Sequence, residues 1–180
     1  MTFTDTHCHL ADPKLADTLP AVLTEAQAAG VARFIVPATS PKDWRAVAQL
    51  ERPSENIHIA LGIHPWFSDG LNEAAFQELE SELIRHPQAW VGEIGLDFYG
   101  KEQTQAQRDT QTDVFIRQLI LAQNLNRRVI IHNLKASAAI AAAVKTAGFT
   151  RGGIVHAFSG SVEEARILVK LGFKIGIGSL

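Results

Sequence analysis

The chain has 180 residues, of which 46% are hydrophobic and 20% charged, and its formal net charge is -2 at pH 7. This composition is typical of a globular protein, and the length predicts one domain covering residues 1–180. The near-neutral balance excludes nucleic-acid binding through a general basic charge, so a nucleic-acid substrate would have to be held by local contacts.

Cysteine content and hydropathy indicate where the protein resides. The single cysteine, Cys8, excludes an intramolecular disulfide framework and fits a reducing compartment. No apolar run approaches the ~20 residues that a membrane span needs. The first residues also lack the charged and apolar regions of a signal peptide. We therefore expect a cytoplasmic protein that does not enter a membrane.

Short apolar runs alternate with helical patterns along the whole chain. The expected strands cover residues 3–8, 33–37, 57–62, 90–94, 128–132, 153–156 and 173–177. The expected helices cover residues 14–29, 41–51, 72–86, 104–125, 137–147 and 162–171. Short apolar strands that are each followed by a helix predict a parallel sheet covered by helices.

The first strand carries a His-x-His pattern. Side chains two residues apart on a strand point to the same face, so His7 and His9 are expected to project together and Cys8 to point away. Two imidazoles that converge at a strand end suit a divalent metal ion. An ordinary strand with two partly buried histidines has the same pattern, so the other strands must decide between the two interpretations.

Polar residues recur where the other strands end. They are His64, Glu93, His132 and His156. A (β/α) barrel gathers its active site at the C-terminal ends of its strands, whereas an open sheet uses a single switch point. The sequence therefore predicts an α/β fold of the TIM-type (β/α) barrel, incomplete, with about seven of eight strands present. A complete barrel takes typically ~250 residues, so we expect either a fragment or a chain whose open edge is covered by self-association.

Glu93 is the most informative of these polar residues. A carboxylate inside an apolar strand costs several kcal/mol unless it is paired or metal-bound. Imidazole and carboxylate ligands together suit zinc, manganese or iron, and a central Glu93 could bridge two metals roughly 3.5–4 Å apart that activate water. Asp97, four residues later, is expected to be a partner of a ligand or a turn cap.

Five motifs occur in order along the chain: DTHCH at 5–9, GIHP at 62–65, GEIGLD at 92–97, VIIH at 129–132 and VHAFSG at 155–160. Together they resemble the TatD family of metal-dependent hydrolases, which is related to the amidohydrolases. The resemblance implies a TIM barrel, two divalent metal ions (zinc, manganese, magnesium or iron) and phosphodiester hydrolysis by metal-activated water. The implied activity is of the 3'-5' exodeoxyribonuclease type on DNA.

The resemblance also implies roles for individual residues. His7 and His9 would hold one metal, His132 and His156 would hold the second, and Glu93 would bridge them as a catalytic residue. The family usually supplies a further aspartate at the end of strand eight, beyond the end of this chain. We therefore expect the half-site of His132 and His156 to hold metal more tightly than that of His7 and His9.

Substrate contacts are also implied. His64 would lie near the substrate phosphate, with a catalytic and binding role. The family often has Ser-Arg after the strand-five histidine, where this chain has Asn133 and Leu134, so Lys135 is the candidate phosphate-binding cation. The aromatics after strands three and four would either stack on bases or pack over the barrel mouth; they are Trp66, Phe67, Phe98 and Tyr99. Trp44 and Trp90 are expected to be core or packing residues.

Two other functions fit the same residues. The site could hydrolyse a small-molecule ester, amide or phosphodiester in place of DNA, which the slightly acidic net charge favours. Alternatively, the chain could be an inactive metal-binding fragment or a subunit completed by a partner.

Overall fold

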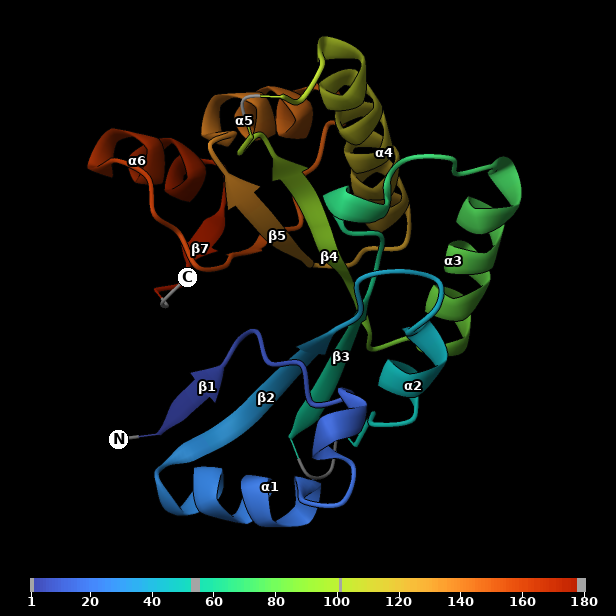
Figure 1. The fold of residues 1–180 in the computed structure, drawn as a ribbon. Helices are drawn as coiled ribbons and strands as arrows, with labels where there is room; N and C mark the ends of the chain where they lie inside the picture. The colour runs from blue at the N-terminus through green and yellow to red at the C-terminus, as the bar shows by residue number, and fades with distance from the viewer. Residues whose placement is uncertain (1, 53–55, 101, 178–180) are drawn as a thin grey trace.

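The structure, a computed structural model, describes residues 2–52, 56–100 and 102–177. These residues form one parallel seven-stranded sheet with the strand order β1-β2-β3-β4-β5-β6-β7. The sheet curls like part of a barrel and carries the helices on its outer side (Figure 1). The predicted α/β architecture with seven strands is confirmed.

Strands and helices alternate along the chain. The strands are β1 (Phe3–Asp5), β2 (Val31–Pro37), β3 (Ile57–Leu61), β4 (Trp90–Asp97), β5 (Val129–Leu134), β6 (Gly153–Val155) and β7 (Phe173–Ile175). The α-helices are α1 (Leu19–Ala28), α2 (Trp44–Ala48), α3 (Glu73–Arg85), α4 (Gln105–Asn124), α5 (Ser137–Thr146) and α6 (Val162–Lys170). Two short 3-10 helices, η1 (Pro13–Leu15) and η3 (Pro65–Phe67), lie in the loops after β1 and β3.

The main core lies between the sheet and the helices. Leu79 and Leu83 of α3 and Phe115 and Leu119 of α4 are almost fully buried against the strands. Burial of each such side chain stabilises the fold by about 1.5–3 kcal/mol. Trp44 belongs to the same core, as predicted, and its indole N–H donates to the carbonyl of Gly62 at 2.8 Å.

A second, smaller apolar cluster lies on the concave face of the sheet. It consists of Ile35, Ala60, Ile130 and Ile154, with Trp90 partly buried against it. Successive strand residues point to opposite faces, which is why neighbours such as Ile130 and Ile131 belong to different clusters. This inner cluster separates the C-terminal ends of the strands from a polar layer at their N-terminal ends.

The first strand is shorter than predicted. β1 ends at Asp5, so the prediction that strand alternation aligns His7 with His9 is wrong. The Asp5 carboxylate accepts a hydrogen bond from the backbone N–H of His7 at 3.1 Å. This is a local turn in which the aspartate competes with the sheet for the chain. Both histidines therefore lie in the loop that follows β1.

The first helix is also divided. Residues 14–29 were predicted as one helix, but η1 begins after the N-cap Asp12, and α1 begins only at Leu19, just before Pro20. Proline has no N–H to donate and is tolerated only in the first turn of a helix, so Pro20 marks a helix start.

The fourth strand is longer than predicted. β4 was expected to end at residue 94, but it extends to Asp97, its last residue.

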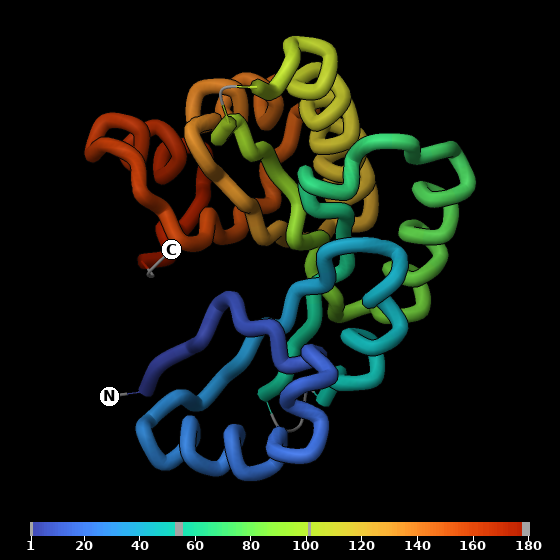
Figure 2. Tube along the Cα trace, in the orientation of Figure 1, coloured from blue at the N-terminus to red at the C-terminus, as the bar shows by residue number. Residues whose placement is uncertain are grey.

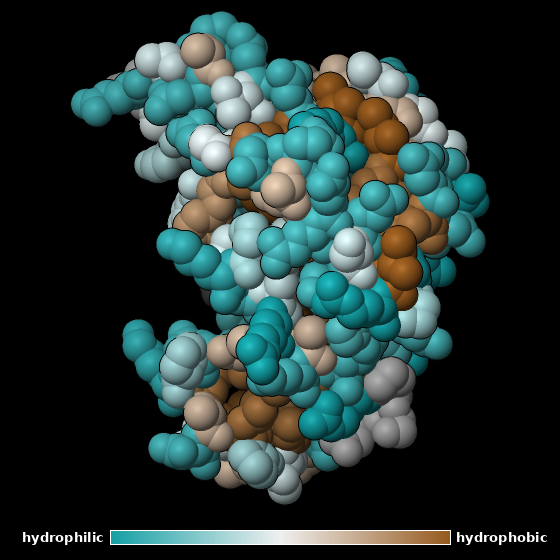
Figure 3. All heavy atoms as spheres, turned by 90° about the vertical axis from the view of Figure 1, so that its right-hand side faces the viewer, coloured by the Kyte–Doolittle hydropathy of each residue, from teal (hydrophilic) through white to brown (hydrophobic). Residues whose placement is uncertain are grey.

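The two edge strands, β1 and β7, lie on the same side of the molecule, and the backbone traces of the two ends of the sheet are separate there (Figure 1 and Figure 2). Within the described residues they are not paired with each other. The face that carries α3 is mostly hydrophilic, with apolar side chains in separate patches (Figure 3). None of the described helices is long and apolar enough to cross a membrane.

Candidate metal centre

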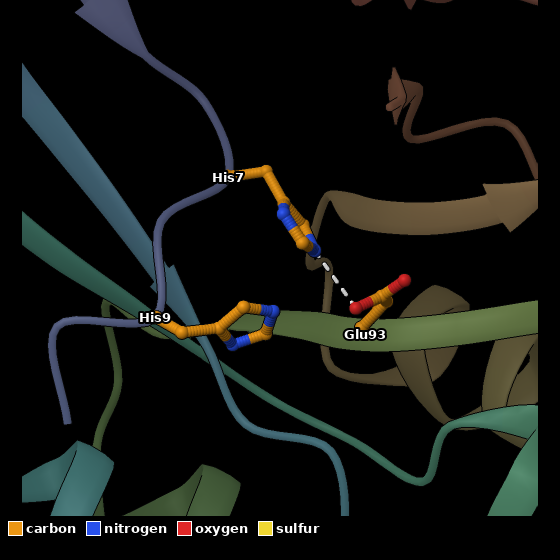
Figure 4. Close-up of side chains that lie close together, drawn as sticks. All are labelled: His7, His9 and Glu93. Carbon is orange, nitrogen blue, oxygen red and sulfur yellow. Dashed lines mark hydrogen bonds and ion pairs between the residues drawn. The ribbon is translucent and has the colours of Figure 1, made fainter. Parts of the chain in front are cut away.

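The loop after β1 brings two histidines to the end of the sheet. His7 and His9 extend from this loop toward Glu93 on β4 (Figure 4). Their rings meet edge to face with centroids 4.7 Å apart, and His7 Nε2 lies 2.8 Å from a Glu93 oxygen. The predicted convergence is therefore present, although a turn produces it instead of the strand.

Glu93 is the centre of the cluster and is only 3% exposed. One of its oxygens lies 3.0 Å from His132 Nδ1, 2.5 Å from His156 Nε2 and 3.5 Å from His64 Nε2, and the other contacts His7. Burial alone would raise the pKa of the carboxyl, but hydrogen bonds from these imidazoles outweigh it and hold the pKa well below its usual range. Glu93 is thus an ionised acceptor that four separate segments of the chain approach.

Metal-ligand geometry occurs on both sides of this carboxylate. Within the described residues, two groups have donor atoms all within 4.8 Å of one another. They are His7, His9 and Glu93, and His64, Glu93 and His132. The first group includes the exposed His9, whereas two of the three members of the second are buried. Glu93 belongs to both groups, which is the position of a bridging ligand.

His156 lies between the two groups. Its ring stacks on that of His7 with centroids 3.8 Å apart and planes inclined by 1°. Its centroid is 5.5 Å from that of His132, its predicted partner at the second metal. Both His132 and His156 contact the same oxygen of Glu93. All five predicted ligands therefore meet in one cluster.

The surroundings shift the pKa values of the imidazoles in different directions. Partial loss of hydration lowers the pKa of His9 and burial lowers that of His156, and neighbouring imidazoles add to both effects. Burial acts in the same direction on His132, but its contacts with Glu93 and Asp97 outweigh burial and raise its pKa. A neutral imidazole offers the lone pair that a metal needs, so the lowered pKa values favour metal binding by His9 and His156, whereas the contacts of His132 with the two carboxylates favour its protonated form when no metal is bound. Nitrogen donors around one carboxylate fit zinc, manganese or iron.

The hydrogen bonds of His64 distinguish it from the other imidazoles. Its ring is 4% exposed, and its Nδ1 accepts the backbone N–H of Trp66 at 3.2 Å as the N-cap of η3. A neutral imidazole whose Nδ1 accepts must carry its proton on Nε2. The Nε2 that faces Glu93 is then an N–H donor without a free lone pair. This geometry favours the predicted role of His64 as a substrate contact over a role as a ligand.

Asp97 connects the cluster to an exposed aromatic. Its Oδ2 atom lies 3.3 Å from His132 Nε2 and accepts the indole N–H of Trp66 at 2.7 Å. A histidine that binds metal through one nitrogen commonly donates the other N–H to a carboxylate. Asp97 is placed for that function, as expected of a ligand's partner. The link to Trp66, 31 residues away in sequence, had no sequence signal.

Gly95 allows β4 and β5 to approach each other beside His132. Its φ is +141°, and a Cβ at this position would lie 2.1 Å from the carbonyl oxygen of His132. Only glycine tolerates both the conformation and the contact. Gly95 of the GEIGLD motif is therefore needed for the backbone position of His132, a candidate ligand.

Two other residues take the positions that sequence suggested. Lys135 follows β5 closely and is exposed, with its charge near Glu164 of α6. Cys8 packs away from the imidazoles, where Sγ lies 3.5 Å from the carbonyl of Ile35, and burial raises the pKa of its thiol to about 12. A nucleophilic cysteine needs a lowered pKa, so Cys8 is not suited to that chemistry.

Known proteins share this architecture. A model of the family described as TatD related DNase matches residues 4–180. The chain is 36% identical over 178 residues to YjjV of Escherichia coli K12, named an uncharacterized metal-dependent hydrolase, covering 98% of this chain and 68% of the relative. It is 31% identical over 176 residues to YabD of Bacillus subtilis 168, which has the same description, covering 97% and 68%.

Solved structures agree with these sequence matches. The crystal structure of YjjV has a TM-score of 0.87 at 35% identity, covering 96% of this chain and 66% of that chain. A TatD family hydrolase from Entamoeba histolytica has a TM-score of 0.83 at 22% identity, covering 98% and 65%, and supports the fold. The chain spans about two thirds of the length of these relatives. The predicted TIM-type fold and the predicted family are confirmed: the chain belongs to the TatD family.

Proposed function

We propose that this chain is a divalent-metal-dependent hydrolase that cleaves phosphodiester bonds in DNA, with exonuclease action from the 3' end. The observation that carries the proposal is the buried carboxylate of Glu93, which contacts imidazoles from four separate segments of the chain. The family description names a DNase, which supports DNA as the substrate.

The ligand assignment takes His7 and His9 from the first group around Glu93, and in the second it replaces His64 by His156, which contacts the same Glu93 oxygen as His132. His7 and His9 would hold one divalent ion, His132 and His156 would hold the other, and Glu93 would bridge them. Bound ions of this kind supply Lewis-acid stabilisation of developing charge and a nucleophile at neutral pH.

The residues around the ligands have complementary functions. His64, with its proton on Nε2, would donate a hydrogen bond to a phosphate oxygen of the substrate. Asp97 would hold the ring of His132 in one orientation. The indole of Trp66 is 71% exposed and anchored by Asp97, so it offers a fixed surface on which a base can stack. The exposed Lys135 is the proposed cation for phosphate.

The proposal is tested by removing and restoring metal. The chain is treated with a chelator, then reloaded separately with zinc, manganese, magnesium or iron, and each sample receives single-stranded DNA labelled at the 5' or the 3' end. We expect the chelator to abolish hydrolysis and at least one metal to restore it, with mononucleotides released from the 3' end. Full activity of a metal-free sample would contradict metal dependence.

The same assay separates the substrate classes. A small phosphodiester, a carboxylic ester and an amide are supplied to the reloaded protein beside DNA. Faster turnover of DNA supports the nuclease assignment. Turnover of the small substrates without cleavage of DNA would overturn it and favour the small-molecule alternative.

A further inference from the structure

A layer of positive charge lies inside the curled sheet, at the ends of the strands opposite the metal centre. Arg33 precedes Ile35 by two residues, and Arg128 precedes Ile130 by two, so each points to the same concave face as its isoleucine. Lys174 of β7 pairs in register with Ile154 on that face. These three cationic side chains are exposed to solvent, so this end of the concave face is an accessible, positively charged surface.

These side chains line a cavity of about 540 Å³. Its polar lining includes Arg33, His58, Arg128, Arg151 and Lys174, and it contains no carboxylate among the described residues. The volume is in the range of small-molecule sites, about 300–1,000 Å³. A concave wall lined by charges of one sign concentrates the electric field and attracts ions of the opposite sign.

The cations of this cavity are not neutralised by the described part of the chain. No salt bridge found there involves Arg33, Arg128, Arg151 or Lys174. Glu51 acts electrostatically on His58 of the lining, but its carboxylate contacts His86 Nδ1 at 2.7 Å. The layer therefore concentrates like charges that an anionic ligand would compensate.

One wall of the cavity is apolar and aromatic. Trp90 lines it and packs against the inner cluster that contains Ile35, Ile130 and Ile154. The guanidinium of Arg128 lies 5.6 Å from the centroid of the Trp90 ring. Arg128 is thus placed where one ligand could contact the cation and the indole together. A ligand that fits would carry a compact multiple negative charge joined to a planar ring.

We propose that this cavity is a second binding site, for a nucleoside monophosphate. Arg33, Arg128 and Lys174 would hold the phosphate dianion, and the base of the nucleotide would lie against Trp90. Guanidinium groups match phosphate oxygens in geometry as well as charge. The site is separate from the metal centre, so the inference does not rest on the proposed nuclease activity.

The test is calorimetric titration of the metal-free chain, in the presence of a chelator, with thymidine 5'-monophosphate. Thymidine and inorganic phosphate are titrated separately to divide the ligand into its parts. We expect one nucleotide per chain, weaker binding of inorganic phosphate, and no binding of thymidine. Added salt should weaken binding because it screens exposed charges.

Variants locate the binding. Arg128→Gln combined with Lys174→Gln should weaken nucleotide binding at least about tenfold, since each removes a charged hydrogen-bond donor. The control combines Lys145→Gln with Arg166→Gln, exposed positions on α5 and α6 that change the net charge equally, and should bind like the native chain. Trp90→Leu should weaken the nucleotide and leave inorganic phosphate unchanged. Circular dichroism verifies that each variant is folded.

Four results would overturn the inference. The first is that the nucleotide does not bind the native chain. The second and third are that its affinity falls equally in the two double variants, or does not fall when Arg128 and Lys174 are both replaced. The fourth is that inorganic phosphate binds as tightly as the nucleotide. None of them depends on hydrolysis, so failure here is distinguishable from failure of the nuclease assay.

Discussion

Replacing Asp97 by asparagine tests how the candidate metal centre is oriented. The substitution keeps the shape and an oxygen that can accept the indole N–H of Trp66, but it removes the charge facing His132 Nε2. A hydrogen bond to a charged group contributes about 1.5–3 kcal/mol, and ~1.4 kcal/mol corresponds to a factor of ten in affinity. We therefore expect metal affinity to fall about 10–100-fold, the range seen for carboxylate partners of metal-bound histidines.

The assay is competition for zinc or manganese against a chromophoric chelator, with native and variant chains under identical conditions. Asp113→Asn is the matched control, because it makes the same chemical change at an exposed position of α4. An Asp97→Asn affinity within about twofold of the native value, or an equal loss in the control, would refute the proposed orientation of His132 by Asp97.

Three further predictions concern the surroundings of the site. Gly95→Ala should lower the free energy of unfolding by about 2–4 kcal/mol, because its Cβ would meet the carbonyl of His132. Gly100 has a similar φ of +134° but open space around it, so Gly100→Ala should lower the free energy of unfolding by less, as measured by denaturant titration. Equal losses of stability in the two variants would argue against the contact. Cys8, with its thiol pKa raised to about 12, should resist iodoacetamide at pH 8 until the chain is unfolded, as mass spectrometry would show, and rapid labelling of the native chain would contradict its burial. Trp66→Ala should raise KM for single-stranded DNA about 5–100-fold with a smaller effect on kcat, since base stacking contributes ~1–3 kcal/mol; an unchanged KM would contradict a stacking role.

The sequence predicted the order and number of strands because each strand is a short apolar run flanked by helical segments. It also predicted that polar residues at strand ends would meet, since parallel strands end at one edge. Glu93 could be singled out because an unpaired carboxylate in an apolar strand is costly. These inferences need only local pattern and the geometry of parallel sheets.

Local hydrogen bonds and long-range contacts were harder to predict. The turn formed by Asp5 ends β1 early, so two histidines converge from a loop and not from a strand. The proline at position 20 was a visible signal for a later helix start. The contact of Trp66 with Asp97 joins η3 to the last residue of β4, and no spacing rule connects the two positions.

Anomalous diffraction from crystals of the metal-loaded chain would test the central claim most directly. The account predicts two metal peaks on opposite sides of the Glu93 carboxylate, one beside His7 and His9 and the other beside His132 and His156. Glu93→Gln crystals should lose at least one of these peaks. Well-ordered crystals of the loaded native chain with no peak at Glu93, or with metal bound only elsewhere, would contradict the account.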